Sequence, residues 1–262
     1  MTTHKKQPTI LVTNDDGITA PGIRELVDAV RGLGKIIVVA PDAPQSGMGH
    51  AVTIGKPLRL DKVDDLFDGV EAWQSTGTPV DCVKLARDKI LGHRPDFCVS
   101  GINHGANHSI NVLYSGTMSA AMEAAIEGIP SVGFSLLDYS WGADFTLAGE
   151  IAHRIVKRML EEGAAPHTLL NVNIPKCSTA DFKGIKLCRM ALGRWVEDFD
   201  HRKDPRGRDY FWMTGRFETM GETADTDVEA LEQNYASVVP IHFDLTQEQL
   251  LREYQARWGG VM

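Results

Sequence analysis

Short apolar runs alternate with helical patterns along the first two thirds of the chain, and this alternation strongly limits the possible folds. Residues 9–13 and 35–40 are runs that can be buried on both faces of a sheet, and residues 21–32 between them have a helical pattern with Pro21 near the first turn. Strand, helix and strand in this order form a β-α-β unit. The pattern continues to residue 174. We therefore predict an α/β fold, a Rossmann-like doubly wound, mostly parallel sheet with helices on both faces.

The other elements of this core follow the same order. We predict strands at residues 57–60, 70–75, 95–100, 131–136 and 168–174, and helices at 78–91, 116–128 and 145–162. The helix at 78–91 has a clear start, because Thr78 can cap it, Pro79 fits its first position and Asp81 suits its positive end.

The rhythm changes after residue 175. Residues 185–217 mix aromatic and charged side chains, which is typical of strands or hairpins outside a parallel sheet. Residues 238–243 indicate one more strand, and residues 246–258 a terminal amphipathic helix. This section has no obvious core of its own. We expect a single domain over 1–262, with the core at 1–180 and a β-rich arm with the terminal helix at 181–262.

Composition excludes several classes of partner. A chain of 262 residues with 43% hydrophobic and 24% charged residues can form a sizeable globular core. Its 27 Lys and Arg against 35 Asp and Glu give a net charge of -8, so we expect neither a nucleic-acid polymer nor an anionic membrane as partner. The apolar run at 10–12 is too short for a signal peptide or a membrane span, which favours a cytoplasmic location.

The cysteines form neither a metal motif nor a disulfide framework. They are scattered and include no C-x-x-C pair. We predict reduced, buried thiols at Cys82, Cys98, Cys177 and Cys188.

Polar segments follow three of the predicted strands, where an open α/β sheet binds its ligands. They are 14–17 (NDDG), 41–50 (PDAPQSGMGH) and 100–114 (SGINHGANHSINVLY). Asp15 and Asp16 can converge on one ligand if the chain turns at Gly17. Two adjacent carboxylates repel each other unless a cation lies between them or one is protonated. On its own, however, NDDG is more often a turn that begins a helix.

Two neutral oxygen donors from the next loops change this balance. Ser46 lies in a loop with Gly47 and Gly49, and Asn103 follows Gly101. Either alone is an ordinary loop residue. Two carboxylates, a hydroxyl and an amide oxygen together would form a site for a hard divalent cation, with Mg²⁺ or Mn²⁺ preferred over Zn²⁺.

An anion site is predicted beside this cation site. Ser115, Gly116 and Thr117 stand directly before the small-residue helix, where free N–H groups and the helix dipole favour a phosphate. A plain helix cap by Ser115 or Thr117 is the alternative. Asn107 in the same loop can donate to a phosphate oxygen or serve as a turn residue.

The chain resembles the SurE survival-protein nucleotidases, a family of metal-dependent phosphatases. The matching segments, in the family's order, are 10–23, 38–53, 75–86, 95–107, 114–135, 171–175 and 226–246. The resemblance implies that one divalent cation per subunit, Mg²⁺ or Mn²⁺, is bound by Asp15, Asp16, Ser46 and Asn103. It also implies that Asn107, Ser115, Gly116 and Thr117 hold the phosphate.

The resemblance further implies the reaction and the assembly. The expected substrates are small phosphate esters, namely nucleoside 5′-monophosphates, with 3′-monophosphates and short polyphosphate as further substrates. Asp15 and Asp16 are the expected catalytic residues, and Asp16 either orients or deprotonates the attacking water or is itself the nucleophile. A homodimer or homotetramer is expected, with the terminal section in subunit contacts. We expect these contacts to include Trp195, Tyr210, Phe211 and Trp212, with stacking on a base as the alternative for these side chains.

The chain departs from the family pattern after Asn107. His108-Ser109-Ile110-Asn111 stands where the family usually has a Leu-Gly-Asp-Asp-like stretch. This replaces a flexible glycine and two acidic groups but leaves the expected metal ligands untouched. We expect it to affect substrate preference or loop mobility rather than activity.

Other functions remain as alternatives. A haloacid-dehalogenase-type phosphatase carries an aspartyl nucleophile where this chain has Asn14, and a nonenzymatic nucleotide sensor would use the same cradle without turnover. A serine hydrolase lacks its G-x-S-x-G motif around Ser46 and Ser115, and a dinucleotide-dependent oxidoreductase lacks G-x-G-x-x-G after the first strand.

Other prominent polar residues, near these loops and in the C-terminal arm, have simpler interpretations. We predict solvated loop side chains at His50, His104 and His108. A solvated charged surface is predicted at Arg202, Lys203, Arg206 and Arg208.

Overall fold

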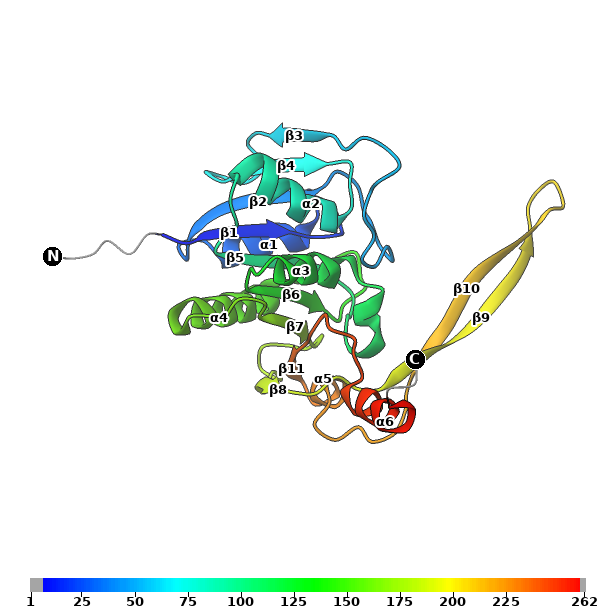
Figure 1. Ribbon diagram of the computed structural model, residues 1–262. Helices are drawn as coiled ribbons and strands as arrows, with labels where there is room; N and C mark the ends of the chain where they lie inside the picture. The colour runs from blue at the N-terminus through cyan, green and yellow to red at the C-terminus, as the bar shows by residue number, and fades with distance from the viewer. Residues whose placement is uncertain (1–6, 260–262) are drawn as a thin grey trace.

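A nine-stranded sheet forms the centre of the computed structural model, which describes residues 7–259. Its strands are β1 (Thr9–Thr13), β2 (Lys35–Pro41), β3 (Leu60–Val63), β4 (Glu71–Ser75), β5 (Phe97–His104), β6 (Ser131–Leu136), β7 (Leu169–Ile174), β8 (Gly184–Leu187) and β11 (Tyr235–Pro240). They lie in the order β3-β4-β2-β1-β5-β6-β7-β11-β8 (Figure 1). The strands from β4 to β7 are parallel, whereas β3 runs antiparallel to β4 and β11 antiparallel to β7.

Helices cover both faces of this sheet. The residues of α1 (Pro21–Ala29) and α4 (Thr146–Glu162) join one core, and those of α2 (Pro79–Leu85) and α3 (Gly116–Ile126) join another. Ile10 and Val12 of β1 belong to the first core and Leu11 to the second, as the alternation of a strand requires. The predicted doubly wound, mostly parallel α/β fold is therefore confirmed.

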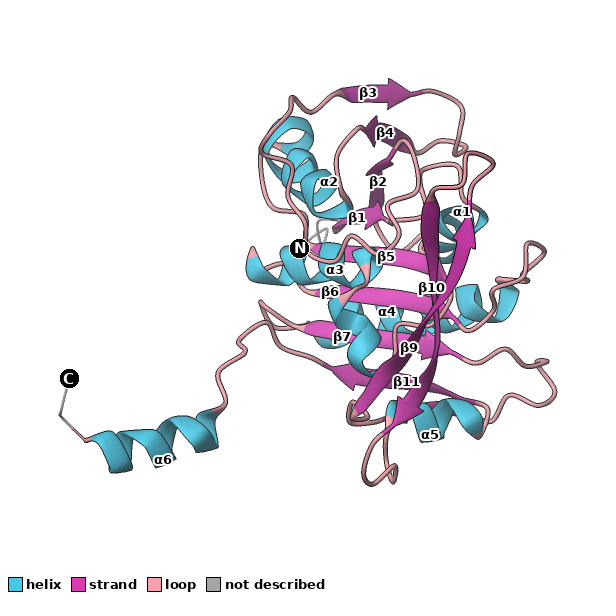
Figure 2. Cartoon of the chain, turned by 90° about the vertical axis from the view of Figure 1, so that its right-hand side faces the viewer, coloured by secondary structure: helices cyan, strands magenta, loops and turns pink. Residues whose placement is uncertain are grey.

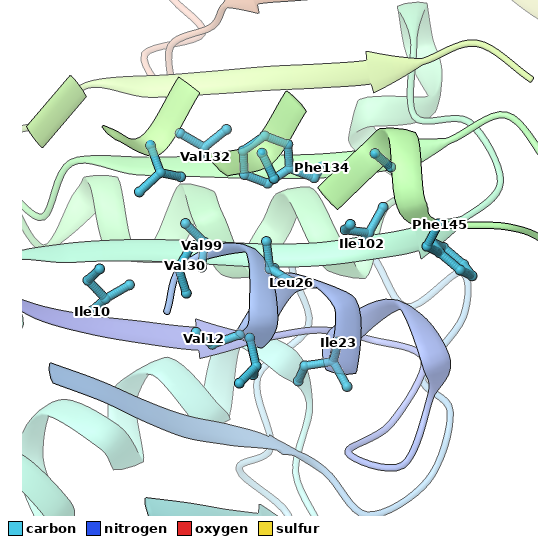
Figure 3. Close-up of a cluster of buried hydrophobic side chains, with 14 of the residues drawn as sticks. Ile10, Val12, Ile23, Leu26, Val30, Val99, Ile102, Val132, Phe134 and Phe145 are labelled. Carbon is cyan, nitrogen blue, oxygen red and sulfur yellow. The ribbon is translucent and has the colours of Figure 1, made fainter. Parts of the chain in front are cut away.

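The core around α1 brings this helix very close to the sheet. Ile23 and Leu26 gather with Val99 and Phe134 in a cluster that excludes solvent (Figure 3). Each such side chain contributes roughly 1.5–3 kcal/mol when fully buried. A Cβ atom at Gly22 would lie 2.0 Å from the carbonyl oxygen of Ile102, so only glycine permits this contact. The close contact fixes the start of α1 beside the end of β5.

The direction of the chain across the sheet reverses at β1. Strands β2 and β5 lie on opposite sides of β1, and both run parallel to it. The loops that leave the carboxyl ends of β1 and β5 therefore separate and leave a crevice, which is where open α/β sheets bind ligands.

The C-terminal section is divided between the sheet and a projecting ribbon. β11 spans Tyr235–Pro240, not 238–243 as predicted, and pairs with β7, while β8 extends the sheet beyond it. The register is set by Ala236 and Val238, which enter the core around α1. The short helix α5 (Asp227–Glu232) was not predicted, because one and a half turns give too little periodicity.

The ribbon is the hairpin of β9 (Gly193–Lys203) and β10 (Asp209–Thr219), which extends away from the sheet (Figure 1). Its register pairs Trp195 with Phe217 and Phe199 with Met213, and paired residues share a face. Phe199 and Met213 are 58% and 71% exposed. Phe211 lies on the same face, and the surface formed by Phe199, Phe211 and Met213 is called the apolar ribbon face below. The described part of the chain leaves it uncovered.

The terminal helix α6 (Glu248–Trp258) also lacks a partner in the described residues. None of its side chains is buried, and Figure 2 shows it extending away from the sheet. The predicted β-rich arm and terminal helix are present, although β8 and β11 belong to the central sheet.

Three local expectations need correction. The strand predicted at 57–60 is β3 at Leu60–Val63, where the chain can pair with β4. The helix predicted at 78–91 is α-helical only to Leu85 and continues as a wider π-type turn to Leu91, ending at the left-handed Gly92. Of the four free thiols, those of Cys177 and Cys188 are half-buried rather than buried. Among residues 7–259, no helix is both long enough and apolar enough to cross a membrane.

Candidate functional site

A cavity of about 290 Å³ lies where the chain direction reverses. Its lining residues come from the loops after β1 and β2, from the end of β5 and the segment that follows it, from the start of α3 and from the base of the ribbon. They are Asp15, Asp16, Ser46, Gly47, Asn103, His104, Ala106, Asn107, Asn111, Tyr114, Ser115 and Trp195. The four predicted metal ligands are thus brought together, beside two of the predicted phosphate residues. Among the described residues that line the cavity there is no lysine or arginine.

The start of α3 holds Asp15 in place. Asp15 is only 4% exposed, and the hydroxyl of Thr117 donates a hydrogen bond to its Oδ1. A Cβ atom at Gly116 would lie 2.6 Å from the Cβ of Asp15 and 2.9 Å from its Oδ2. Gly116 and Thr117 therefore contact the carboxylate directly, while Ser115 caps the helix by accepting from the N–H of Met118 at 3.0 Å.

The two neighbouring carboxyl groups are both costly to ionise. Burial raises the pKa of Asp15 from 3.8 to about 6, the bond from Thr117 opposes this rise, and the charge of Asp16 adds to it. Burial also raises the pKa of Asp16, although the backbone N–H of His104 donates to its Oδ2 at 3.1 Å. A cation between the carboxylates would favour their charged forms. This pair therefore fits a cation.

Neutral oxygens complete the donor set. The amide nitrogen of Asn103 donates to the carbonyl of Gly105 at 2.7 Å, so its Oδ1 is left to accept or to ligate. Ser46 is exposed, in a loop tied to the site by a bond from the N–H of Gln45 to the carbonyl of Asp15 at 2.8 Å. Two carboxylates and two neutral oxygens suit Mg²⁺ or Mn²⁺.

Asn107 is fixed by the neighbouring strands. Its backbone N–H donates to Oδ1 of Asn173 and its amide nitrogen to the hydroxyl of Ser135, both at 2.8 Å. Asn171 donates to the carbonyl of Asn107 at the same distance. Ser135, Asn171 and Asn173 were not predicted as site residues. The alternation of Asn171 and Asn173 in an otherwise apolar strand was the available signal.

The segment that departs from the family pattern contacts the base of the ribbon. Ser109 has a φ of 52°, a conformation that glycine adopts more easily. Its hydroxyl donates to the carbonyl of Ala191, and its N–H donates to the carboxylate of Asp227, each at 2.8 Å. Asp227 is fully buried and also accepts from the N–H of Ala191 at 2.9 Å. Asp227 therefore joins this segment to the ribbon, a role that its sequence position did not reveal.

The histidines differ from the prediction. His104 is half-buried, lines the cavity and lies 2.5 Å through Nε2 from the carbonyl of Ser140. His108 is also half-buried, and burial lowers its pKa. The prediction of solvated side chains is wrong for both. His50 is exposed but pairs through Nε2 with the buried carboxylate of Glu123 at 2.9 Å.

The aromatic and basic residues of the ribbon lie in different surroundings. Trp195 lines the cavity, whereas Tyr210, Phe211 and Trp212 are exposed farther along the ribbon. The predicted solvated surface is confirmed for the four basic residues Arg202, Lys203, Arg206 and Arg208, which are all exposed.

The chain is similar to proteins of one known family. Residues 10–197 match the model of the family described as survival protein SurE. The chain is 56% identical to the 5′-nucleotidase SurE of Christiangramia forsetii, over 95% of this chain and 96% of that protein. It is 55% identical to the 5′-nucleotidase SurE of Flavobacterium psychrophilum, over 92% and 93%.

A solved structure is similar over almost the whole chain. The crystal structure of the SurE protein from Aquifex aeolicus is 38% identical in sequence, with a TM-score of 0.81. The likeness covers 95% of this chain and 99% of that one.

Proposed function

The chain belongs to the SurE family of 5′-nucleotidases, and we propose that it hydrolyses nucleoside 5′-monophosphates to nucleoside and phosphate with one divalent cation, Mg²⁺ or Mn²⁺, per subunit. We extend the proposal to 3′-monophosphates and short polyphosphate as further substrates. All are small phosphate esters or anhydrides, in keeping with a cavity of about 290 Å³.

The observation that carries this proposal is the pair of adjacent carboxyl groups beside the start of a helix. Asp15 and Asp16 are both costly to ionise without a cation. Asp15, Asp16, Ser46 and Asn103 would hold the cation. When bound, it supplies positive charge to a phosphate oxygen and lowers the pKa of water.

The chain's own residues supply the remaining roles. The N–H groups at Ser115 and Gly116 and the amide of Asn107 would hold the phosphate and stabilise the charge that develops on it. Asp16 would orient the attacking water in line with the leaving oxygen and accept its proton. The new bond joins the water oxygen to phosphorus, and the bond to the nucleoside oxygen breaks, with a proton passing to that oxygen. Asp15, held by Thr117, keeps this arrangement fixed.

Phosphate release from a panel of nucleoside monophosphates tests the proposal. The protein is assayed as purified, after EDTA treatment, and after addition of Mg²⁺ or Mn²⁺. We expect release that EDTA abolishes and the metals restore. Absence of metal-dependent release from every substrate would favour the nucleotide sensor instead. Trapping of a phosphoenzyme would favour a covalent aspartyl route, although Asn14 occupies the position of that nucleophile.

We also propose that the protein is a homodimer or a homotetramer. The apolar ribbon face and α6 are exposed in the single chain, and a second copy would cover them. Light scattering tests this, and a monomer at micromolar concentration would overturn it. The cytoplasmic location and the division of the chain at residue 180 stay predictions from the sequence.

A further inference from the structure

The cavity has an aromatic wall that the proposed metal and phosphate sites do not use. Asn111, Tyr114 and Trp195 line it, the first two before the start of α3 and the third near the base of the ribbon. Tyr114 and Trp195 are 57% and 40% exposed. A cavity whose other lining is mostly polar thus presents two aromatic side chains to solvent.

The indole of Trp195 is held from two sides. Its Nε1 donates a hydrogen bond to Oδ1 of Asn111 at 2.7 Å. Its ring meets the ring of Phe217 edge to face, with centroids 6.1 Å apart, and Phe217 meets His108 in the same way at 5.1 Å. A flat ligand that stacks on an already oriented ring loses less free energy to side-chain ordering.

The spacing along the wall matches a mononucleotide. Asn111 lies four residues before Ser115, and the first half of that stretch belongs to the 3₁₀ turn Ser109–Leu113, with Tyr114 at its end. At about 2.0 Å per residue, the two positions are roughly 8 Å apart. When the phosphate of a ligand lies at Ser115, the part of the ligand that reaches Trp195 is therefore the group separated from the phosphate by one sugar unit. In a nucleoside 5′-monophosphate that group is the base.

We propose that Trp195 binds the base of the substrate by stacking, while the phosphate lies at the start of α3. This inference rests on the proposed function and adds a reason for the site to prefer nucleotides over simple sugar phosphates. The single N–H of the indole donates to Oδ1 of Asn111, so Trp195 has no donor left to read the edge of a base. Stacking accepts every base. The site therefore selects nucleotides with little discrimination among bases.

The test compares adenosine 5′-monophosphate with ribose 5-phosphate, which lacks the base. The measured quantity is the ratio of the two kcat/KM values. In Trp195→Ala we expect this ratio to fall about tenfold, mainly through a higher KM for the nucleotide. Trp195→Phe keeps an aromatic face and should recover most of the ratio.

Trp212→Ala is the matched control. Trp212 is on the same ribbon, on the opposite face, and is 60% exposed outside the cavity. It should keep the wild-type ratio, and light scattering on each variant monitors assembly. An unchanged ratio in Trp195→Ala, or an equal fall in Trp212→Ala, would overturn the inference.

A binding measurement separates this inference from the proposed function. The chain has five tryptophans. We expect adenosine 5′-monophosphate to quench part of the tryptophan fluorescence of the wild type, and we expect this quench to be absent in Trp195→Phe. A wild-type protein with no turnover but with this quench would overturn the proposed reaction and support the base site. Turnover with the same quench in Trp195→Phe would overturn the base site alone. Neither turnover nor quench would overturn both.

Discussion

The sheet buries its apolar side chains, whereas the ribbon exposes them to solvent. Ile10 and Val12 of β1 are 0% exposed, whereas Phe199 and Met213 of the ribbon are 58% and 71% exposed. The sheet is complete within one chain because helices cover both faces. In the described chain the ribbon is anchored at its base, where the carboxylate of Asp227 accepts hydrogen bonds from the backbone N–H groups of Ala191 and Ser109. The residues proposed for catalysis thus lie on the element that one chain can stabilise alone, and those proposed for assembly on the element that it cannot.

Asp16→Asn should have the largest effect on activity. It should change the catalytic site at the sheet and leave the ribbon and its role in assembly unchanged. It keeps the shape of the side chain but removes its charge and its basicity. We expect phosphate release to fall at least about 1000-fold, since both metal binding and orientation of water are affected. Circular dichroism and the oligomeric state should stay those of the wild type. Near-normal phosphate release would refute the role given to Asp16.

Gly116→Ala tests how closely α3 fits the carboxylate of Asp15. The added methyl group would lie 2.6 Å from the Cβ of Asp15 and must displace it. We expect about a 100-fold loss of kcat and a stability loss of about 1–3 kcal/mol. The matched control is Gly142→Ala, because a Cβ atom there meets nothing within 4 Å. Equal kcat values for the two variants would show that this contact does not matter.

Asp15→Asn should reveal the cost of the buried charge. The pKa of Asp15 is raised from 3.8 to about 6, so its contribution to stability is full below pH 3.8 and is lost as the pH rises through 6. In EDTA at pH 7.5 we therefore expect the variant to be more stable than the wild type, by up to about 3 kcal/mol.

Urea unfolding of both proteins at pH 4 and pH 7.5 measures this difference. It should shrink toward pH 4, where Asp15 is largely protonated in the folded wild type. Saturating Mg²⁺ at pH 7.5 should remove it, because a bound cation favours the charged carboxylate. A wild type that is the more stable protein in EDTA at pH 7.5 would contradict the prediction.

The smallest effect on folding is expected from the ribbon. Phe199→Ser and Met213→Ser change exposed side chains of the apolar ribbon face, so the stability of an isolated chain should change by less than about 0.5 kcal/mol. Assembly should weaken, which sedimentation at several concentrations measures. Thr214→Ser, on the other face of β10, is the control. Unchanged assembly in both serine variants of the apolar face would remove the distinction drawn between sheet and ribbon.

The sequence predicted those parts of the site that depend on local rules. The positions of Asp15, Ser46 and Asn103 follow from where apolar runs end, because loops at the carboxyl ends of parallel strands converge. The bonds of Asn107 to Asn173 and Ser135 join segments far apart in the chain, so a local pattern can mark Asn173 as a polar residue in an apolar strand but does not identify its partner. Trp195 was predicted in a subunit contact, and its place in the cavity lining was not predicted, since that place depends on where the ribbon leaves the sheet.

The cavity lining includes no lysine or arginine among the described residues, and this has a thermodynamic consequence. With Asp15 and Asp16 unneutralised, the lining repels a phosphate ester, so on the proposed function the cation and the ester must increase each other's affinity. Such coupling is reciprocal, and each ligand strengthens the binding of the other by the same factor. Inorganic phosphate, the product, should therefore slow the inactivation of the enzyme by EDTA. The same coupling would make product inhibition stronger as the metal concentration rises.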